Sequence, residues 1–119
     1  MDVQFRFTAG FGKVVEIKYK TEKKMKVIVV ATRKSDASQD EIAPYLGPES
    51  DHVLAMIKQD VVREVYSRSD GKGAVVILEC DNEAHAKEIV SQFPLAKAGL
   101  LEAEYYGAKP YRGIVQHVK

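Results

Sequence analysis

Three residues with side chains suited to acid–base chemistry share one predicted strand. Glu64, Tyr66 and Arg68 stand at every second position between residues 61 and 68. Because side chains alternate between the two faces of a strand, this spacing places a carboxylate, a phenol and a guanidinium on one face. In a cleft, Glu64 could move a proton, Tyr66 could orient an oxygen and Arg68 could bind a carboxylate bidentately. The alternative is that they are the solvated charges and cross-strand pairs of an edge strand.

His52 is the fourth candidate for a catalytic role. It falls in a predicted helix, where it could serve as a general base, and the alternative is an exposed or capping histidine. Haem binding would need an axial histidine facing a cleft, and His52 is the candidate for that as well. The three histidines and the single Cys80 lack metal-ligand spacing, so the sequence predicts no metal and no cofactor.

Composition and charge narrow the class of protein. The chain has 119 residues, of which 45% are hydrophobic and 29% charged, values typical of a single globular domain with a modest core. A formal net charge of +1 provides no basic field, so we expect no nucleic-acid partner. No apolar run is long enough to cross a bilayer and no secretory signal is visible. With one cysteine, these features indicate a cytoplasmic protein without a membrane partner.

A hairpin between residues 61 and 80 organises the predicted fold. Residues 61–67 and 74–80 are rich in β-formers, and Asp70-Gly71 lies in the segment between them. An Asp-Gly pair between two such runs is a strong hairpin signal, because tight turns that match the strand twist need positive φ. The second run, Ala74–Cys80, is almost continuously apolar, which is typical of a central strand.

The elements on either side of this hairpin complete a known order. Apolar periodicity predicts strands at 26–33, 61–67, 74–80 and 100–106, a main helix at about 48–60 and a second helix after a cap at Asp81 or Asn82. Ser38 or Asp40 could cap a further helical start, and Pro44 and Pro48 interrupt the segment after it. The order β-α-β-β-α-β predicts an α+β protein with a ferredoxin-like antiparallel sheet, residues 27–31 and 74–78 being central.

The N-terminal residues form an extension to this domain. Alternation over residues 2–20 predicts two amphipathic strands joined by a glycine turn, so we divide the chain into a hairpin and linker, 1–24, and a domain, 25–119. Since an isolated hairpin is marginally stable, its apolar face is expected to pack on something else. Apolar residues on both faces of the central strands predict a homodimer, sheet on sheet, and the hairpin could extend it to a higher oligomer.

Two segments carry a resemblance to a known superfamily. Residues 62–70, VREVYSRSD, with 73–80, GAVVILEC, resemble the central part of bacterial muconolactone Δ-isomerase-like proteins. Residues 93–102, FPLAKAGLLE, resemble those proteins too and are similar to the end of YciI-like proteins. The resemblance covers about residues 25–110 and implies a dimeric α/β barrel. The His–Asp dyad of YciI-like proteins has no counterpart here, because His52 lacks its flanking pattern.

Two alternative functions follow, and the resemblance implies the first of them. The first is a metal-independent isomerase that moves a proton on a small carboxylated or enolisable compound, with Glu64, Tyr66, Arg68 and His52 as its candidate residues. The second is a non-catalytic dimer that binds a small ligand or assists another protein. The enzyme requires a pocket containing an acid or base with a perturbed pKa, whereas a binding protein needs only an apolar pocket.

Overall fold

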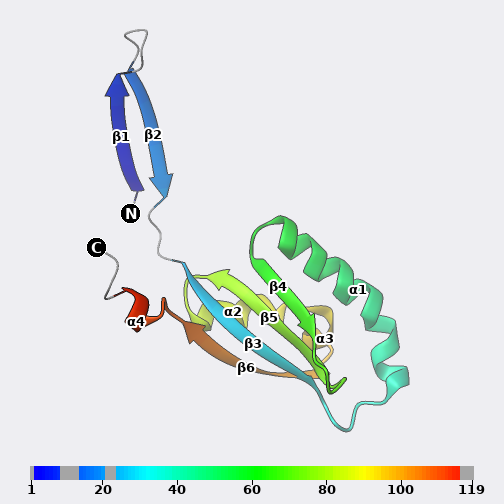
Figure 1. The fold of residues 1–119 in the computed structure, drawn as a ribbon. Helices are drawn as coiled ribbons and strands as arrows, with labels where there is room; N and C mark the ends of the chain where they lie inside the picture. Colours follow the sequence, from blue (N-terminus) through cyan, green and yellow to red (C-terminus); the bar gives the residue numbers. More distant parts are fainter. Residues whose placement is uncertain (1, 9–13, 21–23, 116–119) are drawn as a thin grey trace.

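The computed structural model describes residues 24–113 with their side chains and residues 2–8, 14–20 and 114–115 by their backbone. Its main body is an α+β domain built on a four-stranded antiparallel sheet, in the order β4-β5-β3-β6 (Figure 1). The elements are β3 (Met25–Arg33), α1 (Gln39–Lys58), β4 (Val62–Ser67), β5 (Gly73–Cys80), α2 (Glu83–Ser91), α3 (Pro94–Lys97), β6 (Leu101–Ala108) and α4 (Arg112–Val115).

The order of the strands agrees with the sequence pattern. The two nearly continuous apolar strands, β3 and β5, occupy the centre, and the mixed strands β4 and β6 form the edges. Val27 lies opposite Leu78 and Val29 opposite Val76 in the central pair. This arrangement is compatible with a ferredoxin-like fold.

Two further strands precede the sheet. β1 (Asp2–Thr8) and β2 (Val14–Lys20) pair antiparallel in a two-stranded sheet of their own, with Phe5 opposite Ile17. The glycine turn between them and their side chains lie outside the described residues. The packing of the hairpin and its part in assembly therefore stay predictions.

Helix α1 is longer than the sequence predicted. It begins at Gln39 rather than near Pro48, because Ser38 and Glu41 form a reciprocal capping box at its start. Pro44 and Pro48 lie inside it, four residues apart on one exposed face. The carbonyl groups that lose an N–H partner to these prolines therefore face water, which satisfies them.

The ends of the helices follow ordinary capping rules elsewhere. α1 ends at Lys58, and Asp60 takes the left-handed conformation that more often falls to glycine after a helix, with φ at 60°. Asn82, one of the two predicted caps, begins α2 by accepting a hydrogen bond from the His85 N–H at 2.8 Å. α3 is a single turn that begins at Pro94, where the sequence indicated only a helix end.

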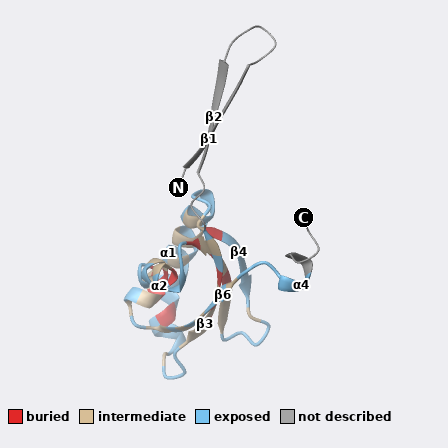
Figure 2. Cartoon of the chain, turned by 90° about the vertical axis from the view of Figure 1, so that its left-hand side faces the viewer, coloured by how far each residue is buried: buried red, intermediate tan, exposed pale blue. Residues whose placement is uncertain are grey.

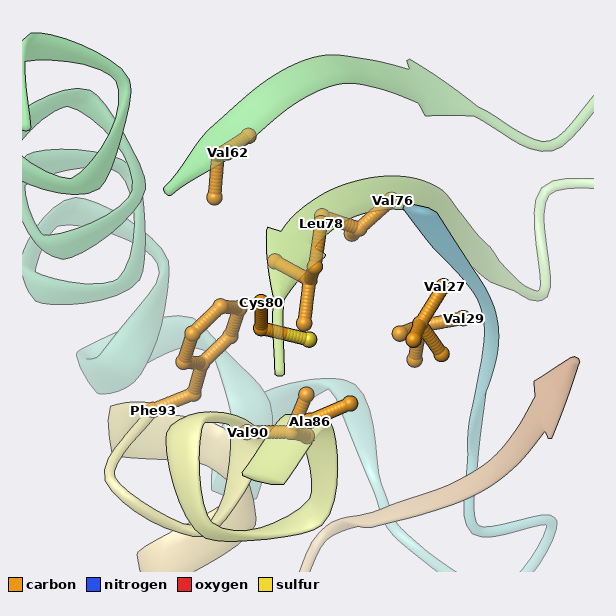
Figure 3. Packing of buried hydrophobic residues seen from close by; sticks show 9 residues of the cluster. All are labelled: Val27, Val29, Val62, Val76, Leu78, Cys80, Ala86, Val90 and Phe93. Carbon is orange, nitrogen blue, oxygen red and sulfur yellow. The ribbon is translucent and has the colours of Figure 1, made fainter. Parts of the chain in front are cut away.

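The core lies between one face of the sheet and the helices (Figure 2). It consists of Val27, Val29, Val62, Val76, Leu78, Cys80, Ala86, Val90 and Phe93 (Figure 3). Val27 and Leu78 are fully buried, and the thiol of Cys80 is buried with them, which raises its pKa. α2 contacts β5 and β6, whereas the main contacts of α1 are with α3 and β4, so α1 does not close over the central strands.

Candidate functional site

A cavity of about 530 Å³ lies between α1 and the sheet face that carries the core. Its lining includes Val29, Ala31, Ala74 and Val76 from the central strands and Leu46, Val53, Leu54 and Ile57 from α1. Three of these α1 side chains stay partly exposed, with Leu54 at 52%, although they point toward apolar surface. The helix therefore presents an apolar wall to an open space, and volumes of this size are typical of small-molecule sites.

Glu49 is the carboxylate in this cavity. Its Oε1 accepts a hydrogen bond from the backbone N–H of Leu95 at 3.0 Å. Phe93 provides no side-chain cap for α3, so Glu49 of α1 satisfies a free N–H in the first turn of that helix. Burial raises the pKa of the Glu49 carboxyl, while the Leu95 bond and the nearby His52 partly lower it.

Arg33, at the end of β3, is the other charged residue among those that line the cavity. Its backbone N–H donates to the Lys72 carbonyl at 2.9 Å, which ties this end of β3 to the β4–β5 turn. It lies opposite Leu101 of β6, which also lines the cavity. The site thus combines a large apolar wall with one potential acid and one cation.

His52 lies on α1 one turn after Glu49 and does not line this cavity. Its ring packs edge-on against Phe93, with the ring centroids 5.0 Å apart. Nε2 is buried and no described residue hydrogen-bonds it. His52 instead borders a second, shallower hollow that includes Tyr45 and Lys97.

Glu64 and Tyr66 come together on the opposite face of the sheet. The Tyr66 hydroxyl donates to Glu64 Oε1 at 2.8 Å, and this bond with the Glu64 charge raises the pKa of Tyr66. Glu64 is paired with Ile77 and Tyr66 with Val75, and these partners alternate with the core residues of β5. Both side chains are exposed on this helix-free face, and neither lines the cavity.

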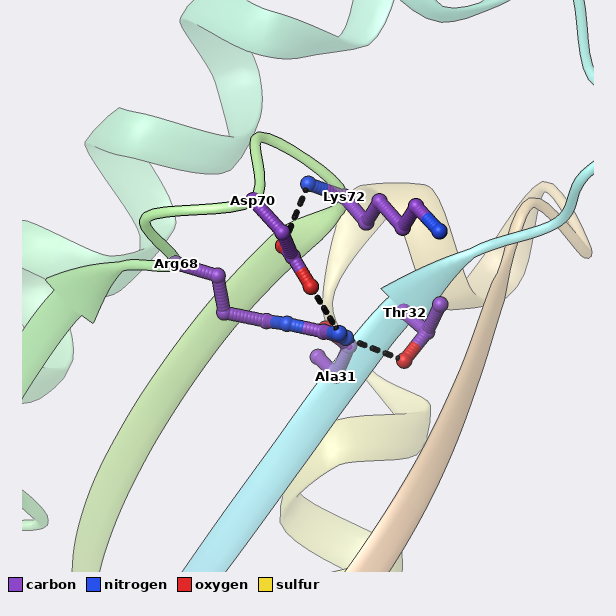
Figure 4. Close-up of polar contacts among 5 residues, drawn as sticks. All are labelled: Ala31, Thr32, Arg68, Asp70 and Lys72. Atoms are coloured by element: carbon purple, nitrogen blue, oxygen red, sulfur yellow. Dashed lines mark hydrogen bonds and ion pairs between the residues drawn. The ribbon is translucent and has the colours of Figure 1, made fainter.

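The guanidinium of Arg68 is bound by Asp70 of the β4–β5 turn and by Thr32 of β3 (Figure 4). One guanidinium nitrogen donates to Thr32 Oγ1 at 2.6 Å and the other lies 2.5 Å from Asp70 Oδ2. Asp70 also accepts from the Lys72 N–H at 2.9 Å, and this bond, with Arg68, lowers the pKa of Asp70. Arg68 therefore fastens the β4–β5 turn to β3, and the structure does not bring it together with His52.

The helix-free face repeats the same polar pair at its other edge. On β6 the Tyr106 hydroxyl donates to Glu104, which raises the pKa of Tyr106. Between the two edges lies an apolar stripe of Ile28, Val30, Val75 and Ile77, all partly exposed in the single chain. The sequence signal for these two polar pairs is the motif Glu-x-Tyr, which occurs at 64–66 and again at 104–106.

The sequence pattern did not mark Glu49 and Arg33 as site residues, and for Glu49 this is because the predicted helix began too late. Placing the helix start near Pro48 removed Ile42 and Leu46 from the apolar stripe. With the helix begun at Gln39, positions 42, 46, 49 and 53 follow helical spacing, and Glu49 stands out as a carboxylate on an apolar face. Arg33 ends an apolar strand, and nothing in the sequence locates α1 beside it.

Comparisons with known proteins add no identification. No protein-family model matches the chain, and no curated protein matches it in sequence. Among the described residues, no group of three or more His, Cys, Asp or Glu side chains is placed to hold a metal ion. In the same part of the chain, no helix combines the length and apolarity needed to cross a membrane.

Proposed function

We propose that this chain binds a small, mainly apolar organic molecule in the cavity between α1 and the sheet. The observation that carries the proposal is the half-buried Glu49 in the otherwise largely apolar lining of a cavity of about 530 Å³. Ligand sites in proteins have this composition, a large apolar surface with a few polar groups that orient the ligand.

Glu49 would be the orienting group. Its Oε1 is held by the Leu95 N–H, and no described residue hydrogen-bonds Oε2. Because burial raises the pKa of this carboxyl, it keeps its proton to a higher pH than an exposed glutamate. It can then donate a hydrogen bond to a ligand oxygen when protonated and accept one when ionised.

A neutral probe tests the binding proposal directly. We expect 4-phenylbutanol to shift the backbone amide signals of the residues that line the cavity, and Ser67→Trp to abolish these shifts by filling it. Ser69→Trp, in the neighbouring turn and outside the cavity lining, is the matched control and should bind as the wild type does. Shifts confined to the helix-free face, or none at millimolar probe, would refute the proposal.

The second candidate function is a metal-independent isomerase, which the resemblance to muconolactone Δ-isomerase-like proteins implies. The raised pKa of Glu49 favours it, since a general base works best when its pKa lies near the working pH. Of the expected group, Glu64, Tyr66 and Arg68 would then contribute only if a partner subunit covers the helix-free face. His52 of α1 packs against Phe93 and would act, if at all, from the second hollow. A proton-exchange assay on enolisable carboxylates would test this: exchange that survives in Glu49→Gln removes Glu49 as the base.

For either function, we propose that the chain forms a homodimer of the dimeric α/β-barrel type. In the single chain Val30 and Val75 face each other across the central strands and are partly exposed, with Tyr66 and Tyr106 at the two edges. A two-fold axis buries such a face with one self-complementary patch. We place the protein in a reducing cytoplasm, where a buried, unpaired Cys80 is ordinary.

A further inference from the structure

We infer that Arg33 anchors a carboxylate, so that the ligand of the cavity is an apolar molecule carrying a single carboxylate group. The inference rests on the proposed function, because it assigns the ligand class of that same cavity. It is carried by the position of Arg33 in the cavity wall and by the absence of a described partner for its guanidinium.

The position of Arg33 is fixed by its neighbours. Its N–H donates to the Lys72 carbonyl at 2.9 Å, and the N–H of Lys34 donates to the Leu100 carbonyl at 3.0 Å. The end of β3 is thus tied to the turn on one side and to the start of β6 on the other. A side chain on a backbone held in this way is a suitable anchor, because little ordering is left to the ligand.

The guanidinium of Arg33 is not occupied by the described part of the protein. Arg63 pairs with Asp60 and Glu79, and Arg68 pairs with Asp70. Arg33, which is only partly exposed, forms no ion pair and donates no side-chain hydrogen bond to residues 24–113. Glu49, the other charged residue in the cavity lining, is not within ion-pair distance of it.

A guanidinium in this setting selects a carboxylate. Its planar donors match the two oxygens of a carboxylate, and weak hydration makes it suited to partly buried ion pairs. One arginine balances one negative charge. A dianionic phosphate would bring a second charge into a cavity that already contains the Glu49 carboxyl and is otherwise mostly apolar, so a monoanion fits better.

Two probes with the same apolar body test this inference. We expect 4-phenylbutyrate to bind in the cavity about tenfold more tightly than 4-phenylbutanol, both followed by amide chemical shifts at low salt. Arg33→Gln should remove this advantage, because it weakens binding of the carboxylate much more than binding of the alcohol. Lys34→Gln, which removes the neighbouring exposed cation, is the matched control and should keep the advantage. Arg33→Lys should keep part of it, because the charge remains and the bidentate geometry is lost.

Salt provides a second measurement that needs no variant. Raising NaCl from 20 to 500 mM should reduce the advantage of the carboxylate and leave the alcohol unaffected. Equal affinities of the wild type for the two probes, or an advantage that persists in Arg33→Gln, would overturn the inference while the binding proposal stands. Failure of both probes to bind in the cavity would overturn the binding proposal and this inference together.

Discussion

Glu49 couples the proposed site to the stability of the fold, and replacing it with glutamine tests that coupling. Burial raises the pKa of its carboxyl above the ordinary value of 4.5. The folded chain therefore binds the proton more tightly than the unfolded chain. By linkage, the contribution of Glu49 to the free energy of unfolding is complete below about pH 4.5 and is lost as the pH rises through the folded-state pKa.

The magnitude depends on the size of the shift and on exposure, since one unit of pKa difference corresponds to about 1.4 kcal/mol. Because Glu49 is only half-buried, water screens its charge, and we expect the loss between acid and neutral pH to be smaller than for a fully buried carboxyl. In Glu49→Gln the amide oxygen can still accept from the Leu95 N–H, so this variant should lack the pH-dependent loss.

Urea unfolding followed by circular dichroism at several values from pH 4 to pH 8 measures the effect. The stability of Glu49→Gln relative to the wild type should increase as the pH rises from 4 and should level off above the folded-state pKa of Glu49. Glu49→Ala should show the same pH trend but lie about 1 kcal/mol lower throughout, because α3 loses its cap. Parallel curves for wild type and Glu49→Gln would refute the reasoning.

Three further predictions concern assembly and catalysis. Val75→Asp should convert the proposed dimer into a monomer in sedimentation, whereas Tyr111→Asp, at an exposed tyrosine outside the sheet, should not. A wild type that is monomeric at micromolar concentration would contradict the proposed dimer. Deleting residues 1–24 should weaken association and leave 4-phenylbutanol binding intact, and an unchanged size and melting temperature would mean that the hairpin has no part in assembly. If turnover is found, Glu64→Gln tests the strand candidates, and undiminished activity removes Glu64 from the mechanism.

The order of strands in the sheet could be predicted from the sequence because the strands differ in composition. Continuous apolar runs marked the central strands, and alternation with charges marked the edges, which is also the order in the structure. The start of α1 was not predicted, since Pro44 and Pro48 outweighed the capping box at Ser38. Two prolines on one exposed face interrupt hydrogen bonds that water replaces, and a residue-by-residue breaker rule does not see that they share a face.

The candidate site was harder to predict because it depends on which face of the sheet the helices cover. Period-two spacing placed Glu64 and Tyr66 together, as the structure does. It did not indicate that this face is the helix-free one, or that Arg68 is used by Asp70 and Thr32. Glu49 is recognisable only once α1 has its full length, because two of its neighbours on the apolar stripe, Ile42 and Leu46, come before Pro48.

A crystal structure of the wild-type protein with 4-phenylbutyrate would test the central claim most directly. The account predicts the phenyl ring between α1 and the central strands, against Val53 and Val76, with the carboxylate at the guanidinium of Arg33. Ligand bound on the helix-free face, or a cavity left empty at saturating ligand, would contradict it.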